Sequence, residues 1–280
     1  MQETGPKMPE LPEVETIRRQ LESRVAGRKI VKAAANCDSL VFRSCHAAGN
    51  LNRLLAGRKI QSLKRRGKYL LFGLDRGLTL VIHLGMSGNL LVREKSAPRD
   101  QHCHLEISFS DFKLTLRDPR MFGRVALARD SDFSCLTGLA SLGPEPLSME
   151  FNPRWLAEKF RGRKAPVKSL LLDQRIAPGI GNIYSDEACY LARISPLRRA
   201  GGLKPEEIKR LAAAVKRVLK EAIEKIGCTF RDYRTSQGIP GNYQPRAYGR
   251  EGERCRRCGS SIRRKQIAGR SCFFCPGCQN

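Results

Sequence analysis

The sequence has no long apolar run, few aromatic residues and few acidic residues compared with its basic ones. Its longest apolar stretches, such as residues 78–84, are far shorter than the roughly 20 residues of a bilayer-spanning helix, which excludes a membrane-spanning protein. The chain carries 27 Asp and Glu against 52 Lys and Arg, a formal net charge of +25. Because uncompensated charge of this size destabilises a compact fold, it predicts a polyanionic partner, with nucleic acid as the leading class.

A secretory signal is also lacking, and the eleven cysteines are an odd number. Residues 1–7 are polar and resemble neither a secretory nor a transit peptide. A disulfide framework is therefore disfavoured, and we expect a cytoplasmic protein with some of its cysteines on a metal. With 41% hydrophobic residues in 280, the chain has enough apolar material for real cores and favours two domains over one.

The first half of the chain changes from one helical segment to short strands. Apolar residues recur every three to four positions over residues 13–27, which predicts a helix that ends at Gly27. Short runs punctuated by Gly, Asp and Pro then predict an antiparallel sandwich or barrel. The expected strands are residues 29–34, 59–64, 69–74, 78–84, 104–109, 113–117 and 124–128.

The second half is expected to be helical and begins after a proline-rich linker. Prolines in residues 142–153 disfavour regular pairing and place a domain boundary near residue 145. The expected helices are residues 155–160, 167–172, 183–192 and 205–226, the last with a continuous apolar face.

The last thirty residues have few large aliphatic side chains and need another source of stability. Cys255 and Cys258 are separated by two residues, as are Cys275 and Cys278, which is the spacing of a four-cysteine structural zinc site. Cys272 competes, because it precedes Cys275 by the same spacing. Binding of one Zn²⁺ would supply the folding free energy of this segment, whose arginines favour contact with nucleic acid.

Several motifs in order along the chain carry a resemblance to one family. They are PELPEVET at residues 9–16, RGKYL at 66–70, HLGMSG at 83–88, RDPRMFG at 117–123, GIGNIY at 179–184 and AGR at 268–270. Together with the cysteine spacing, this set resembles the bacterial formamidopyrimidine-DNA glycosylases, the Fpg branch of the Fpg/Nei repair family. The resemblance runs from residue 8 to residue 280 and therefore covers essentially the whole chain.

The resemblance implies an α+β multidomain fold and a base excision repair enzyme. The family has an N-terminal antiparallel β-sandwich with a flanking helix, a helix-two-turn-helix domain and a C-terminal zinc finger. It acts as a monomer on duplex DNA, removing 8-oxoguanine and formamidopyrimidines and then nicking the abasic strand. The expected division is residues 1–8 as an extension or mis-assigned start, 9–142 as the catalytic sandwich, 143–153 as linker, 154–249 as the helical domain with a lesion loop, and 250–280 as the zinc finger.

The resemblance also implies roles for individual residues in the chemistry. Pro9 would be the first residue of the mature chain, and its secondary amine would attack C1′ of the damaged nucleotide. Since an α-amino group has a pKa of about 7.7 to 8.0, an appreciable neutral fraction exists at physiological pH. Glu10 matches the family's acid, Lys68 the lysine of β-elimination, and Arg270 the arginine of δ-elimination.

Further residues match the family's DNA contacts. A flipped nucleotide leaves a vacancy in the duplex, which Met86, Arg120 and Phe122 are expected to fill. The expected phosphate contacts are His102, Arg120, Lys164, Lys168 and Asn182. Residues 229–248, rich in Gly, Pro and Tyr, resemble the loop that covers the flipped base.

The sequence departs from the family pattern at its start, where seven residues precede Met8. A peptide bond into Pro9 would make its nitrogen an amide with no usable lone pair, so we expect synthesis to begin at Met8 or the extension to be removed. Two alternatives stay open. One is an endonuclease VIII-like glycosylase for oxidised pyrimidines, and the other a non-catalytic zinc-ribbon protein that binds DNA or lesions, should the extension be retained.

Overall fold

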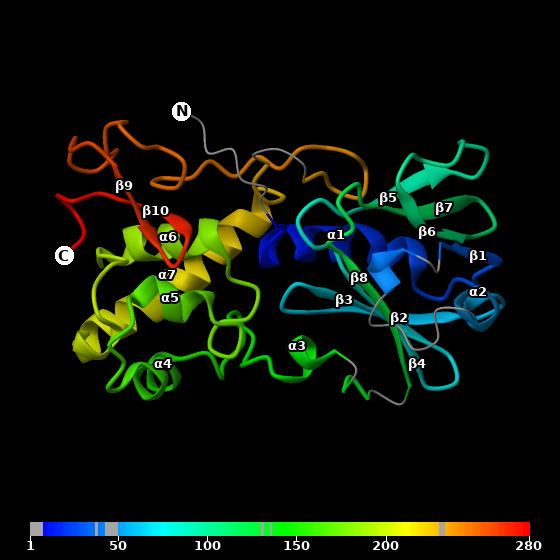
Figure 1. Ribbon diagram of the computed structural model, residues 1–280, viewed down its shortest axis with the longest axis horizontal. Coiled ribbons are helices and arrows are strands. Elements are labelled where there is room, and N and C mark those ends of the chain that lie inside the picture. The colour runs from blue at the N-terminus through cyan, green and yellow to red at the C-terminus, as the bar shows by residue number, and fades with distance from the viewer. Residues whose placement is uncertain (1–7, 37–38, 43–49, 130–131, 135, 230–232) are drawn as a thin grey trace. The chain divides into compact units, whose positions relative to one another are not determined.

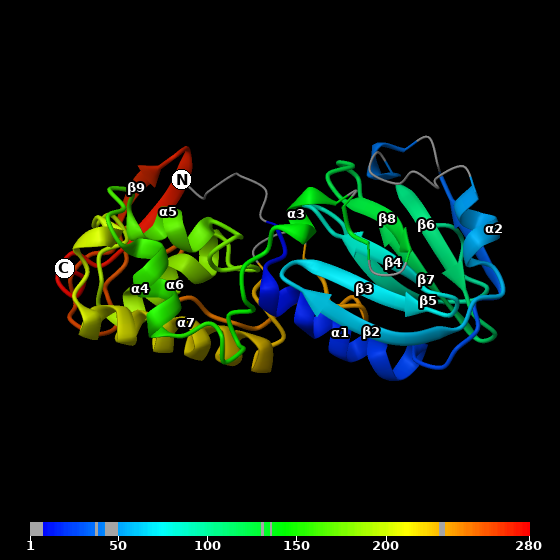
Figure 2. The ribbon, with the colours of Figure 1, turned by 90° about the horizontal axis from the view of Figure 1, so that it is seen from below.

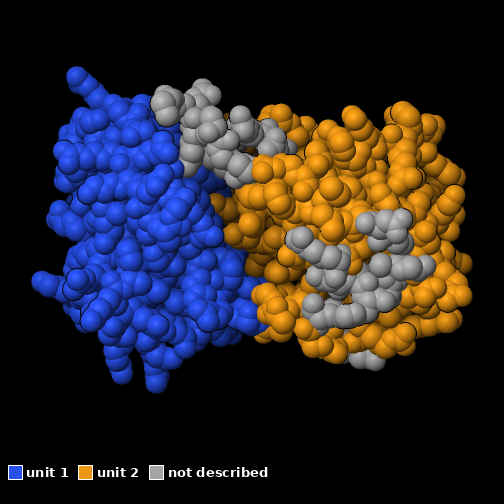
Figure 3. Space-filling model, viewed as in Figure 1, with its two compact units in different colours: residues 1–5, 141–224, 243–280 blue, residues 6–140, 225–242 orange. Residues whose placement is uncertain are grey.

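The computed structural model divides by packing into two compact units, which Figure 3 colours separately. The residues that it describes are 8–36, 39–42, 50–129, 132–134, 136–229 and 233–280. Among these described residues, unit 1 comprises those within 141–224 and 243–280, and unit 2 comprises those within 8–140 and 225–242. The zinc-finger segment therefore packs with the helical residues in one unit. Residues 225–229 and 233–242, which we expected in the helical domain, pack instead with the sandwich. Residues 1–7 lie outside the described part of the chain.

Unit 2 is built on two four-stranded antiparallel sheets (Figure 2), so the predicted antiparallel sandwich is confirmed. In spatial order the first sheet contains β1 (Lys32–Ala35), β6 (Cys103–Ser108), β7 (Phe112–Arg117) and β5 (Asn89–Glu94). The second contains β2 (Ile60–Arg66), β3 (Tyr69–Leu74), β4 (Leu78–His83) and β8 (Arg124–Arg129). Strand β5 was not anticipated, because its sequence NLLVRE begins with consecutive buried residues and shows no alternation.

Helix α1 (Leu11–Val25) packs against β2 and β3 (Figure 2). Pro12 suits the first turn, where its missing N–H has no intrahelical partner. Ile17, Leu21 and Val25 recur at helical spacing and are fully buried. The helix predicted for residues 13–27 is thus confirmed, and it begins two residues earlier. Three shorter helical segments complete the described part of this unit, η1 (Leu40–Phe42), α2 (Leu51–Leu55) and α3 (Thr137–Ala140).

Unit 1 consists of packed helices and a zinc-finger hairpin (Figure 1). Its helices are α4 (Pro153–Phe160), α5 (Val167–Leu172), α6 (Asn182–Ala192) and α7 (Pro205–Glu224), with the short η3 (Ala200–Gly202). Helix α7 packs its apolar face on α4 and α6. It ends two residues before the predicted end, because Ile226 and Gly227 both have left-handed backbone, with φ of 54° and 84°.

The hairpin of unit 1 pairs β9 (Arg263–Ile267) with β10 (Arg270–Phe274), and β10 packs on α6. No helix among the described residues is long and apolar enough to cross a membrane.

Candidate active site and nucleic-acid interface

The amino-terminal end of α1 is held by the buried side chain of Glu13. Its Oε2 accepts a hydrogen bond of 2.8 Å from the Glu10 backbone N–H, which closes a capping box. Its Oε1 accepts one of 2.8 Å from the Cys228 N–H. Glu10 and Glu13 are 3% and 1% exposed, and Pro9 is buried beside them. One carboxylate thus fixes the backbone next to Pro9 and ties it to the segment that follows α7.

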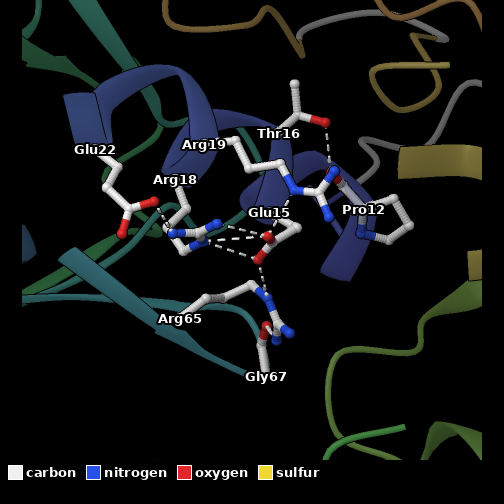
Figure 4. Close-up of polar contacts among 8 residues, drawn as sticks. All are labelled: Pro12, Glu15, Thr16, Arg18, Arg19, Glu22, Arg65 and Gly67. Carbon is white, nitrogen blue, oxygen red and sulfur yellow. Dashed lines mark hydrogen bonds and ion pairs between the residues drawn. The ribbon is translucent and has the colours of Figure 1, made fainter. Parts of the chain in front are cut away.

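The turn between β2 and β3, which contains Gly67 and Lys68, is tied to α1 by Glu15 (Figure 4). Glu15 Oε2 accepts a hydrogen bond of 3.0 Å from Arg65 Nε, and Arg65 Nη1 donates one of 3.0 Å to the Gly67 carbonyl. Both side chains of this ion pair are nearly buried, with 8% of Arg65 and 11% of Glu15 exposed. The backbone carrying Lys68 is therefore positioned by a charged network that starts on α1.

His83 at the end of β4 lies near Lys68 and packs against Tyr69, with ring centroids 4.7 Å apart and ring planes tilted by 50°. Burial, assisted by the positive charge of Lys68, lowers the pKa of His83 to about 4. Its Nδ1 accepts a hydrogen bond of 3.1 Å from the Gly85 N–H. The ring is therefore neutral at physiological pH and fixes the start of the turn that carries Met86.

Two turns of unit 2 pack directly on each other through Gly85 and the buried side chain of Asp118. Gly85 has φ +63°, and a Cβ there would collide with the backbone of Phe122, so only glycine fits. Asp118 accepts hydrogen bonds from the Ser87 hydroxyl and, at 2.7 Å, from the Gly123 N–H. These contacts bring together the two short segments that contain Met86, Arg120 and Phe122.

Phe122 is an exposed large hydrophobic side chain, 39% accessible, and the Arg120 guanidinium lies 4.8 Å from the centre of its ring. An exposed aromatic ring and a cation on one turn suit insertion between bases and contact with a base edge. Met86, on the adjacent turn, is partly buried.

The four predicted metal ligands in unit 1 come together. The sulfur atoms of Cys255, Cys258, Cys275 and Cys278 all lie within 4.8 Å of one another. Two of the Sγ–Sγ distances are 3.4 and 3.9 Å, close to the spacing of about 3.8 Å that tetrahedral zinc with Zn–S bonds of about 2.3 Å requires. The Cys272 thiol is buried, lies 3.5 Å from Asp186 Oδ1 and is not part of this cluster.

Three family descriptions match the chain in the order of its parts. They are the formamidopyrimidine-DNA glycosylase N-terminal domain over residues 8–125, the formamidopyrimidine-DNA glycosylase H2TH domain over 142–233, and the zinc finger found in FPG and IleRS over 252–280. A formamidopyrimidine-DNA glycosylase of Pelotomaculum thermopropionicum is 42% identical, with 97% of this chain and 99% of that protein covered. One of Chloroflexus aurantiacus is 44% identical, with 97% and 98% covered.

The chain belongs to the formamidopyrimidine-DNA glycosylase family. Solved structures of the family agree with its fold. A mutant of the Lactococcus lactis FPG, in complex with Fapy-dG-containing DNA, is 36% identical with a TM-score of 0.89 over 97% of this chain and 100% of that one. A MutM structure in complex with carbocyclic 8-oxo-G-containing DNA is 37% identical with a TM-score of 0.88 over the same shares. The fold class and zinc finger expected from the sequence are thereby confirmed.

The residues matched to the family's chemistry lie in both units. Pro9, Glu10 and Lys68 belong to unit 2, the first two at the start of α1 and Lys68, half-buried, in the β2–β3 turn. Arg270 belongs to unit 1, is exposed, and is the first residue of β10. The hairpin turn before it has left-handed backbone at Ala268 and Gly269, with φ of 48° and 74°, as the tight two-residue hairpins require.

The residues matched to phosphate contacts differ in exposure. His102 and Arg120 in unit 2 and Lys164 in unit 1 are exposed. Asn182 begins α6, and its Nδ2 donates a hydrogen bond of 3.2 Å to the Tyr248 hydroxyl.

Lys168 needs a correction, because its side chain is fully buried and its Nζ lies 2.8 Å from the buried Asp186. The two charges pair with each other inside unit 1, and Lys168 has no exposed surface to offer a phosphate.

Residues 229–248, expected as a mobile loop over the base, include 230–232, which lie outside the described residues. Of its described part, residues 233–242 belong to unit 2 and residues 243–248 to unit 1. The Ser236 carbonyl accepts a hydrogen bond of 2.8 Å from the Val92 N–H of β5, and the Ser236 hydroxyl donates one of 2.8 Å to Gln20 of α1.

Sequence reasoning missed the buried acidic residues that position these segments. Asp118 and Glu15 lie within sequence motifs that predict no role for either, and Asp186 lies outside the motifs. Such residues could be found as acidic residues that stand next to a motif or within an apolar helical pattern. A carboxylate buried there is rarely without a partner, so it predicts a positioning contact.

Proposed function

We propose that this chain is a bifunctional DNA glycosylase and abasic-site lyase that removes 8-oxoguanine and formamidopyrimidines from duplex DNA. The observation that carries the proposal is the match over 97% of the chain to relatives whose solved complexes hold Fapy-dG and 8-oxo-G DNA. The charge of +25 supplies the affinity for phosphates.

Catalysis starts at Pro9, the second residue of the matched segment, which begins at residue 8. Removal of Met8 frees the proline nitrogen, whose lone pair attacks C1′ as the damaged base leaves with its electron pair and a proton. Glu10, buried at the start of α1, protonates the sugar ring oxygen, so that the ring opens to an iminium.

Two eliminations then cut the strand. Loss of the acidified C2′ proton breaks the C3′–O bond, and loss of the C4′ proton breaks the C5′–O bond. Lys68 acts at the first step and Arg270 at the second, where their positive charges stabilise the departing phosphates.

DNA is held and distorted by exposed and half-buried side chains of both units. Met86, Arg120 and Phe122 fill the vacancy left by the flipped nucleotide, and His102, Arg120, Lys164 and Asn182 contact phosphates. One Zn²⁺ per chain, held by the four thiolates, supplies folding free energy only, because four protein ligands leave no open position. We expect a monomer that acts on the bacterial nucleoid in the cytoplasm.

Borohydride trapping on duplexes with 8-oxoguanine opposite C tests the proposal, because hydride reduces the iminium to a stable amine link to DNA. A chain that starts at Met8 should be captured, with mass spectrometry showing Pro9 at its terminus. A matched chain that starts at Met1 and carries Met8→Leu keeps Pro9 in a peptide bond and should not be captured. Absence of capture with a free Pro9 would leave only the DNA-binding alternative.

Oxidised pyrimidines form a second candidate class, because a Lactococcus lactis FPG complex holds DNA with an oxidised pyrimidine, at 36% identity and a TM-score of 0.87. Cleavage of 8-oxoguanine opposite C should exceed cleavage of thymine glycol opposite A. The reverse preference would favour an endonuclease VIII-like specificity.

A further inference from the structure

Strand β10, which begins at Arg270, lies against two buried charged side chains of unit 1. Lys168 of α5 and Asp186 of α6 are both 0% exposed, and Lys168 Nζ lies 2.8 Å from Asp186 Oδ1. Burying an ion pair costs several kcal/mol per ion, and an apolar pair of similar volume often stabilises a protein equally well or better. The pair therefore adds little to the free energy of folding, and its role is better explained by the groups that it contacts.

The two side chains contact the three consecutive residues directly after Arg270. Lys168 Nζ donates a hydrogen bond of 2.7 Å to the Ser271 carbonyl. Asp186 Oδ2 accepts one of 2.9 Å from the Phe273 N–H, and the Cys272 thiol lies 3.5 Å from Asp186 Oδ1.

Because β9 and β10 pair in a fixed register, these contacts also constrain the tip of the hairpin. Arg270 pairs with Ile267 across the two-residue turn, so a shift of β10 along α6 moves Arg270 by the same amount. The predicted zinc ligand Cys275 follows β10 at its other end. Zinc held by Cys275 and the other three thiolates would fix where the strand ends, and the buried pair fixes the strand next to the arginine.

We propose that Lys168 and Asp186 are positioning residues for the second elimination, holding Arg270 in register through the backbone of β10. This inference rests on the proposed role of Arg270. Displacement of a catalytic group by about 1 Å costs roughly 100-fold in rate. Loss of the contacts of Lys168 and Asp186 with β10 should therefore slow the δ step about 10- to 100-fold. The β step uses groups of unit 2 and should slow by less than about threefold.

Asp186→Asn tests this on duplexes with a preformed abasic site, in the chain that starts at Met8. Gel analysis separates the β product, an unsaturated aldehyde end, from the δ product, a 3′-phosphate end. Borohydride capture and zinc content are measured in parallel. Glu158→Gln is the matched control, because Glu158 also pairs with a lysine but is 62% exposed. Arg270→Ala reports whether Arg270 serves the δ step at all.

Accumulation of β product by Asp186→Asn, with capture and one zinc retained, supports the inference. Should the single variant misfold around an unpaired Lys168, the double variant Lys168→Met with Asp186→Asn removes both charges and still loses the lysine contact to Ser271. An unchanged ratio in either folded variant, or capture that falls in parallel with the δ step, overturns the inference. An unchanged ratio in Arg270→Ala overturns the proposed role of Arg270 and the inference with it.

Discussion

Replacement of Glu15 by Gln tests whether α1 positions the turn that carries Lys68. Glu15 accepts hydrogen bonds from three arginines, at 3.0 Å from Arg18 Nη2, 2.9 Å from Arg19 Nε and 3.0 Å from Arg65 Nε (Figure 4). Burial alone would raise the pKa of Glu15, but the bonds from Arg18 and Arg19 and the charge of Arg65 lower it instead. The carboxylate therefore stabilises the folded chain above its ordinary pKa of 4.5, and this stability is lost as pH falls through the lowered value.

The stability lost in Glu15→Gln can be estimated by adding the contribution of each arginine contact, judged from the exposure of that arginine. Arg65 is only 8% exposed, so its charged hydrogen bond contributes about 1.5–3 kcal/mol. Arg19 is 58% exposed and, as an i,i+4 partner, contributes about 0.3–0.5 kcal/mol. Arg18, with 19% exposed, lies between them. Glu15→Gln should lower the free energy of unfolding at pH 7 by about 2–4 kcal/mol.

Urea unfolding followed by circular dichroism measures this change, and cleavage of abasic-site DNA measures its effect on Lys68. We expect β-elimination to slow about tenfold, because the Arg65 contact to the Gly67 carbonyl loses its anchor, while DNA affinity changes less than about twofold. Glu22→Gln is the matched control on the same helix, since Glu22 pairs with Arg18 but is 51% exposed. Its cost should stay below about 1 kcal/mol. Equal losses in the two variants would refute a special role for Glu15.

Three further predictions concern the metal, the charge and pH. Cys255→Ser should release the zinc, unfold the finger and weaken DNA binding, as measured by metal content and fluorescence anisotropy; tight binding without metal would contradict it. Affinity for undamaged DNA should fall with salt with a log–log slope of roughly −5 if six phosphates are neutralised, and a flat response would contradict phosphate binding. Because the folded pKa of His83, about 4, lies below its ordinary value of 6.5, the unfolded chain takes up the proton first. Stability contributed by His83 is therefore present above pH 6.5 and lost towards pH 4, and urea titrations of His83→Gln should show a smaller loss over that window.

The periodicity of apolar residues correctly predicted helices and strands that bury only one face. Helix α7 and strands such as β3 show that pattern, and both were placed within two residues. Strand β5 was missed, because its first three residues are all buried and the alternation disappears. The path of residues 225–242 was missed for a different reason. Its contacts, such as that of Cys228 with Glu13, join residues 215 positions apart, and no local pattern encodes them.

Motif order located the candidate site but did not show what each residue does. Lys168 illustrates the difference, since the family resemblance implied a phosphate contact at this position. Its exposure is decided by Asp186 on another helix and by the Ser271 carbonyl, 103 residues away. Sequence alone could not separate a lysine that meets solvent from one that completes a buried pair.

The motif at residues 9–16 shows how capping and chemistry share the same residues. Two prolines and three glutamates crowd this segment, which capping alone does not explain. In the structure Glu13 does cap the helix, and in doing so it holds the Glu10 N–H at 2.8 Å and therefore the backbone that follows Pro9. A nucleophile at a chain terminus would otherwise fray, because terminal residues lack the contacts that order them. In the proposed mechanism, the capping box is thus the physical reason that the Pro9 amine is held in a fixed position.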